Sequence, residues 1–147
     1  MIVLDTSGIL AAIDASQQRH QEARAVLEGD PGPFLLSPFV LAEVDYLLGT
    51  RVGAREQVAL LGEVESGAYQ LEAFGPEEVG QAARIVQRYE AMKIGLADAS
   101  IVVIASRAGT NRVLTLDERH FRAIRPARGR GFRILPSELE TDQETRG

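Results

Sequence analysis

The sequence predicts one three-layer α/β domain, in which helices cover both faces of a central, mainly parallel sheet. Short apolar runs alternate with helical segments along the whole chain, and this order is typical of parallel sheets. The first run, Met1–Leu4, is continuously apolar, as expected of a strand that is buried on both faces. A chain of 147 residues, 45% of them hydrophobic, is long enough to form one such core.

The first half of the chain predicts two strands and four helices. The first strand ends at Asp5, and Thr6 or Ser7 could cap the helix that follows. Glycine and proline at 29–33 indicate a loop, and the proline after Ser37 suits the first turn of a helix. The second strand is expected over 34–36, and the helices over 9–15, 17–28, 37–48 and 54–65.

The second half predicts three strands and two helices. Residues 69–74 alternate enough to form a strand. The helix that starts at Gly75 has glutamates in its first turn, where the helix dipole favours them, and Gly109 closes the helix after it. The helices are expected over 75–92 and 97–108, and the last strands over 112–116 and 132–135. Residues 136–147 form a polar tail, so the domain is expected to span 1–135.

Composition and charge exclude several classes of site. The chain has no cysteine and only two distant histidines, which disfavours a disulfide framework and a zinc centre. The net charge of −5 argues weakly against nucleic-acid binding. The longest apolar run is too short to span a bilayer, and the N-terminal run is too short for a signal peptide. We therefore expect a cytoplasmic protein without a membrane partner.

Four acidic residues occupy unusual surroundings. Asp5 and Asp117 follow predicted strands, at the sheet edge where α/β folds form their sites. Asp98 begins a very apolar helix. Glu43 has apolar neighbours three and four positions away and is expected to point toward the packed side, although periodicity alone does not choose between Glu43 and Asp45. A helix cap is the structural alternative for each aspartate, and a buried ion pair with an arginine is the alternative for Glu43.

Together these carboxylates indicate a metal-dependent site. They come from four separate elements, and at least two of them belong to one edge of the sheet. Mutual repulsion makes such a cluster costly unless a cation is bound. Mg²⁺ or Mn²⁺ takes oxygen ligands and usually leaves positions open for water and phosphate oxygens. The pattern therefore points to hydrolysis of phosphodiester bonds.

Four segments, in this order, resemble the successive motifs of a PIN domain. More closely, the chain resembles the VapC toxins of bacterial type II toxin–antitoxin pairs. The match runs from Met1 to about Leu135, and its most specific part is the stretch Thr-Leu-Asp-Glu-Arg-His-Phe. The segments are Ile2–Ser7, Ser37–Glu43, Gly95–Ala99 and Leu114–Phe121.

The resemblance implies a PIN-like three-layer fold and an endoribonuclease that depends on Mg²⁺, with Mn²⁺ as a substitute. It also implies a cognate antitoxin that inhibits the enzyme, an RNA substrate and a homodimer. It favours Glu43 over Asp45 as the fourth member of the family's acidic quartet, which is Asp5, Glu43, Asp98 and Asp117. Three of these would bind the cation, and Glu43 would bind it or orient water.

Other residues near the quartet are expected to support it. The resemblance also matches Thr6, directly after Asp5, and Thr115, two residues before Asp117, to positions that could hold a carboxylate or a water molecule. Arg119, Arg128 and Arg130 belong to an arginine-rich stretch that flanks Asp117, and we expect them to contact RNA phosphates. The alternative is a solvated loop whose arginines pair with the protein's own acids.

Other functions compete with the nuclease. A dehalogenase-like phosphatase would need a second aspartate at position 7, where this chain has Ser7. A dinucleotide-binding domain would need a glycine-rich turn after the first strand, which Gly8 alone does not supply. A PIN-like module that binds RNA or a protein without catalysis, or another metal-dependent phosphoesterase, is the remaining alternative.

Overall fold

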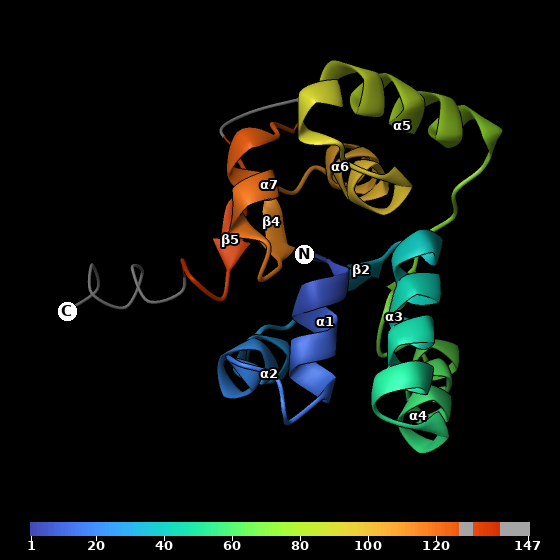
Figure 1. Cartoon of the computed structure of the whole chain (residues 1–147), viewed down its shortest axis with the longest axis vertical. Coiled ribbons are helices and arrows are strands. Elements are labelled where there is room, and N and C mark those ends of the chain that lie inside the picture. Colours follow the sequence, from blue (N-terminus) through green and yellow to red (C-terminus); the bar gives the residue numbers. More distant parts are fainter. Residues whose placement is uncertain (127–130, 139–147) are drawn as a thin grey trace.

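The computed structural model describes residues 1–126 and 131–138 (Figure 1). Its centre is a sheet in which all five strands are parallel, in the order β3-β2-β1-β4-β5. The α/β fold predicted from the sequence is confirmed. The strands are β1 (Ile2–Leu4), β2 (Phe34–Leu36), β3 (Gln70–Leu71), β4 (Arg112–Leu114) and β5 (Arg133–Leu135).

Helices cover the sheet on both sides. In Figure 1, α1 and α2 lie below the strands, α5 and α6 lie above them, and α3 and α4 pack together at one side. The helices are α1 (Thr6–Ile13), α2 (His20–Gly29), α3 (Pro38–Arg51), α4 (Ala54–Ser66), α5 (Pro76–Arg88), α6 (Leu96–Ala108) and α7 (Glu118–Ala123), with a 3₁₀ turn η1 (Glu90–Met92) after α5. None of the helices in the described ranges is long and apolar enough to cross a membrane.

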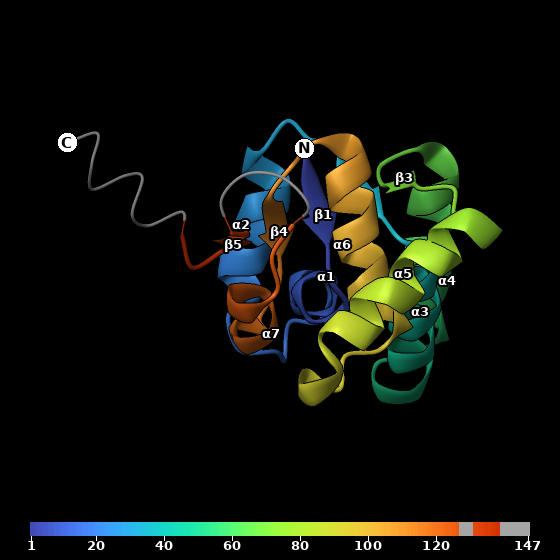
Figure 2. The ribbon, with the colours of Figure 1, turned by 90° about the horizontal axis from the view of Figure 1, so that it is seen from above.

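The core is built around β1 and α6. All three residues of β1 are fully buried, as its apolar run predicts, because helices cover both faces of this central strand. Helix α6 runs beside β1, as the view from above shows (Figure 2), and buries seven consecutive residues, from Ala99 to Ala105. This packing explains why its sequence is apolar on nearly every face.

The strand order reverses at β1, which has β2 on one side and β4 on the other. Ligand sites in open parallel sheets form at the carboxyl ends of the strands on either side of such a reversal. Here these are the ends of β1, at Leu4, and of β4, at Leu114. The first turn of α1 packs directly against this edge, since a Cβ built on Gly8 would lie 2.3 Å from the Leu114 carbonyl oxygen.

The structure differs from the predicted elements at several ends. Helix α1 begins at Thr6 rather than at Ile9, so Thr6 and Ser7 lie inside the helix and Asp5 occupies its N-cap position. Strand β3 has two residues instead of six, because only Gln70 and Leu71 pair with β2. Helix α7 was not predicted, since its six residues are too few to show a helical period.

Candidate active site

A cavity of about 360 Å³ lies at the carboxyl edge of β1 and β4. All four acids of the predicted quartet line it, although they come from four different elements. Asp5 follows β1, Glu43 lies on α3, Asp98 lies in the first turn of α6 and Asp117 precedes α7. The other lining residues are Thr6, Ser7, Leu10, Gln17, Leu47, Arg51 and Leu116.

Asp5 is held by hydroxyl groups from both neighbouring elements. Thr115 Oγ1 donates to Asp5 Oδ2 at 2.7 Å, and Ser7 Oγ lies 3.2 Å from the same oxygen. The backbone N–H of Asp117 donates to Thr115 Oγ1 at 2.9 Å, and that of Leu116 donates to Ser7 Oγ, also at 2.9 Å. This network fixes the Asp5 carboxylate and ties the end of β4 to the start of α1.

Burial and a second carboxylate make Asp5 a weak acid for its type. Asp5 is 5% exposed, and its desolvation is the largest cause that raises its pKa, to about 6. The hydrogen bond from Thr115 opposes this shift, whereas the nearby charge of Asp98 adds to it. A cation placed beside Asp5 would therefore relieve an unfavourable charge.

Asp98 occupies the centre of the acidic cluster. Desolvation raises its pKa, and the charges of Asp117 and Glu43 raise it further, while His120 lowers it. His120 Nδ1 lies 3.5 Å from Asp98 Oδ2 and 3.0 Å from Asp117 Oδ2, yet this buried nitrogen makes no hydrogen bond within the described part of the chain. The imidazole thus lies between two carboxylates and could donate to either after a small rotation.

The structure corrects the predicted orientation of Glu43. Val44 and Leu48 of α3 face the core and are fully buried, whereas Glu43 is exposed at the cavity. The prediction that Glu43 points toward the packed side was wrong, because α3 is apolar on nearly all faces and its period is uninformative. Asp45 faces α4 instead, where Gln57 Nε2 donates to its Oδ1 at 2.8 Å.

The structural alternatives for the acids are only partly supported. Asp5 and Asp117 occupy N-cap positions, but neither side chain makes a capping hydrogen bond. Asp98 lies in the first turn of α6, and its interaction with the Gly95 backbone opposes the rise in its pKa that burial causes. Glu43 forms no ion pair with an arginine among the residues that the structure describes.

Sequence reasoning missed several polar residues around the quartet. Ser37 and Ser100 are fully buried, and their hydroxyl oxygens lie 2.7 Å apart, which links the start of α3 to α6. This bond sets the spacing between the helices that carry Glu43 and Asp98. The sequence pattern indicated Ser7 only as a possible helix cap and as the residue at the position where a phosphatase would need an aspartate. Its position two residues after Asp5, on the same turn, was the available signal.

The predicted RNA-contacting arginines are only partly placed. Arg119 is exposed on α7, two residues after Asp117, and forms no ion pair within residues 1–126 and 131–138. Arg128 and Arg130 lie outside the described residues, as do residues 139–147 of the predicted tail.

The residues present fit a hard divalent cation by their chemistry. The cavity offers four carboxylates and the Thr6 hydroxyl, whose buried oxygen has no hydrogen-bond partner in the described ranges. No three Asp, Glu or His side chains in those ranges are grouped closely enough to hold a metal ion as they stand. Like charges on the carboxylates repel one another, and a bound divalent cation would offset that repulsion.

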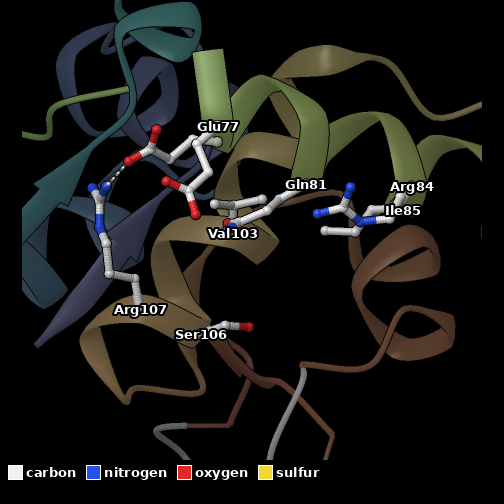
Figure 3. A pocket seen from close by; sticks show the side chains of 8 residues that line it. Glu77, Gln81, Arg84, Ile85, Val103, Ser106 and Arg107 are labelled. Carbon is white, nitrogen blue, oxygen red and sulfur yellow. Dashed lines mark hydrogen bonds and ion pairs between the residues drawn. The ribbon is translucent and has the colours of Figure 1, made fainter. Parts of the chain in front are cut away.

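A larger cavity of about 750 Å³ lies between α5 and α6 (Figure 3). Its charged residues include Glu78 and Arg107, which form an ion pair with an N–O distance of 3.3 Å. None of the four quartet acids lines it. The smaller cavity is the better candidate for catalysis, because it combines carboxylates, raised pKa values and the reversal point of the sheet.

The raised pKa of Asp5 predicts how stability depends on pH. In metal-free protein, Asn at position 5 should increase the free energy of unfolding at pH 7.5 by about 3 kcal/mol, because the folded pKa of about 6 lies above the ordinary value of 3.8. The folded state binds the proton more tightly, so wild type gains stability as pH falls from 6 to 3.8. The advantage of Asp5→Asn should therefore fall to about half at pH 5.

Urea unfolding at several pH values, in the presence of a chelator, measures this difference. Asp30→Asn is the matched control. Burial raises the pKa of Asp30, but the hydrogen bonds and charge of Gly32 and Arg112 outweigh it, so the pKa lies below its ordinary value. That variant should lose stability at pH 7.5 rather than gain it. A stability difference between wild type and Asp5→Asn that is the same at pH 5 and 7.5 would contradict the electrostatic explanation.

Comparison with known proteins supports the resemblance drawn from the sequence. The model of the PIN domain family matches residues 2–125. Ribonuclease VapC26 of Mycobacterium tuberculosis is 43% identical over 135 residues, which cover 92% of this chain and 100% of that protein.

Solved structures share the fold. VapC20 of Mycobacterium tuberculosis, described as a toxin that cleaves the sarcin–ricin loop, has a TM-score of 0.77 at 24% identity and covers 88% of this chain and 100% of its own. VapBC of Salmonella typhimurium, solved bound to DNA, has a TM-score of 0.61 at 19% identity, covering 91% of this chain and 97% of its own. At these identities the two structures support the fold alone.

Proposed function

The chain belongs to the PIN domain family, and from this we propose that it is the toxin ribonuclease of a VapC-type toxin–antitoxin pair. The reaction would be hydrolysis of RNA phosphodiester bonds with Mg²⁺ or Mn²⁺ as cofactor. The observation that carries the proposal is the shared cavity of Asp5, Glu43, Asp98 and Asp117. The 43% identity to a ribonuclease over nearly the whole chain supports the choice of substrate.

We propose Asp5, Asp98 and Asp117 as the residues that hold the cation, because all three line the cavity at the carboxyl edge of β1 and β4. When bound there, a divalent cation supplies positive charge to the phosphate and makes water a better nucleophile. Thr115 and Ser7 keep the Asp5 carboxylate in one orientation through their hydroxyl groups.

Three further side chains can take part in binding and proton movement. Glu43 reaches the cavity from α3 and is suited to accept a hydrogen bond from the attacking water. His120 Nδ1 is within 3.0 Å of Asp117, where it can hold a proton between two carboxylates. Thr6 supplies a hydroxyl at the wall of the cavity that has no hydrogen-bond partner among the described residues.

The partners follow from the same proposal. We propose a cognate antitoxin as the inhibitor, because structures of similar fold were solved as toxin–antitoxin complexes. A homodimer, RNA contacts by Arg119, Arg128 and Arg130, and a cytoplasmic location belong to the proposal as well. The catalytic domain is proposed to span residues 1–135, with 136–147 as an appended tail.

Purified protein incubated with total RNA tests the function. Wild type should cleave RNA in the presence of Mg²⁺. Cleavage should stop when a chelator is added and resume when Mg²⁺ is restored in excess. Asp5→Asn, prepared in parallel, should be inactive although its fold is intact by circular dichroism. Cleavage that persists in Asp5→Asn would show contamination or a different site, and an inactive wild type would refute the proposal.

A further inference from the structure

Arg51 is the one basic residue among the eleven that line the acidic cavity within the described part of the chain. It is the last residue of α3, the helix that also carries Glu43. Four carboxylates surround the same cavity, so an RNA backbone that enters it meets strong repulsion unless a positive group lies nearby. Arg51 is placed to supply that positive charge.

The helix geometry separates the backbone positions of Arg51 and Glu43 along the wall of the cavity. Glu43, Leu47 and Arg51 follow one another at intervals of four residues, which keeps them on one stripe of α3. Eight residues correspond to a rise of about 12 Å along the helix axis. The backbone of Arg51 thus lies about two helical turns beyond that of Glu43, so its side chain is suited to a phosphate beside the reacting one.

Arg51 has no ion pair in the described ranges, although other arginines of this chain do. Arg107 pairs with Glu78 at 3.3 Å, and Arg112 pairs with Asp30 at 2.7 Å. The exposed guanidinium of Arg51 thus keeps all its donors available to a ligand. Its planar arrangement of N–H groups matches two oxygens of one phosphate.

We propose that Arg51 binds an RNA phosphate next to the scissile one and so fixes the position of the strand over the acidic cluster. This inference rests on the proposed ribonuclease function. A purely structural role is the competing explanation, because a cation in the last turn of a helix interacts favourably with the helix dipole. That role would affect thermal stability and leave RNA binding unchanged.

Binding of a labelled single-stranded RNA to the inactive Asp117→Asn variant, with Mg²⁺ present, separates these roles. Adding Arg51→Gln should weaken binding about tenfold, because charge-assisted bonds to a phosphate are lost. The slope of log affinity against log salt should fall by about 0.7, the value for one contact to a single strand. Arg51→Lys should keep the slope and lose part of the affinity, since lysine acts as a point charge.

Arg55→Gln is the matched control. Arg55 is also exposed and lies four residues further on, at the start of α4, but it does not line the cavity. Its loss should change affinity less than twofold, and an equal effect of both glutamine variants would overturn the proposal in favour of diffuse charge attraction. In active protein, Arg51→Gln should raise KM more than it lowers kcat.

RNA substrates with one neutral methylphosphonate linkage locate the contact. A neutral linkage beside the cleavage site should weaken RNA binding by the Asp117→Asn protein. In the Asp117→Asn protein that also carries Arg51→Gln, the same linkage should not reduce the affinity further. If each linkage has the same effect with and without Arg51, the proposal fails while the ribonuclease function stands. If wild type cleaves no RNA with Mg²⁺, it is the proposed function that fails.

Discussion

Asp98→Asn is expected to reduce Mg²⁺-dependent RNA cleavage more than 100-fold, beyond the 10- to 100-fold that loss of an outer-shell partner typically costs. Asp98 interacts electrostatically with Asp5, Glu43 and Asp117, so it is the acid that joins the others into one cluster. Asparagine keeps its size but removes the charge that a cation requires. The measurement is the initial rate of cleavage of an end-labelled RNA at saturating Mg²⁺.

Asp45→Asn is the control for this experiment. Asp45 is also an acid of the site-forming helices, but it hydrogen bonds Gln57 on the side of α4 and does not line the cavity. Its cleavage rate should remain within about twofold of wild type, because surface substitutions away from a site have small effects. Asp98→Asn cleavage within tenfold of wild type would remove Asp98 from the catalytic assignment.

Metal-dependent stability distinguishes the enzyme from a non-catalytic PIN-like module. A protein that binds Mg²⁺ in its folded state gains about 2.7 kcal/mol at a metal concentration 100 times Kd. Wild type should show this gain, and Asp98→Asn should show little of it. A module that had lost its cation site would show no gain in either protein.

The order of elements could be predicted because each signal is local. The apolar Met1–Leu4 run, the glycine–proline loop at 29–33 and Gly109 each act within a few residues, and the structure has a strand, a loop and a helix end at these places. Helix α7 and the shortness of β3 depend on how the chain packs, so periodicity does not reveal them. The all-parallel sheet followed from alternation of strands and helices.

The acids of the candidate site could be selected from sequence for two different reasons. Asp5 and Asp117 follow strands, and parallel strands place their ends at one edge. Glu43 was chosen through family resemblance, and its expected burial was wrong because α3 gives no clear face. The hydroxyl network of Ser7 and Thr115 joins residues more than 100 positions apart, so only the fold shows it.

Gly8→Ala is expected to destabilise the protein by about 3 kcal/mol, the upper end for an added group in a packed core. A Cβ at this position would lie 2.3 Å from the carbonyl oxygen of Leu114 and 2.8 Å from its side chain. The nearest atom belongs to the backbone of β4, which cannot rotate away as a flexible side chain can. Thermal unfolding should show a loss of roughly 10 °C at this chain length.

Gly62→Ala provides the comparison, because nothing lies within 4 Å of its Cβ position in α4. Alanine there should stabilise the helix by about 0.5–1 kcal/mol. Gly8→Ala should also lower cleavage in the fraction that stays folded, since α1 would be pushed from the β4 end that carries Thr115 and Asp117. If Gly8→Ala has the same melting temperature as wild type, then α1 does not pack this closely against β4. The hydrogen bonds that Ser7 and Thr115 make with Asp5 would then require a different packing of these two elements.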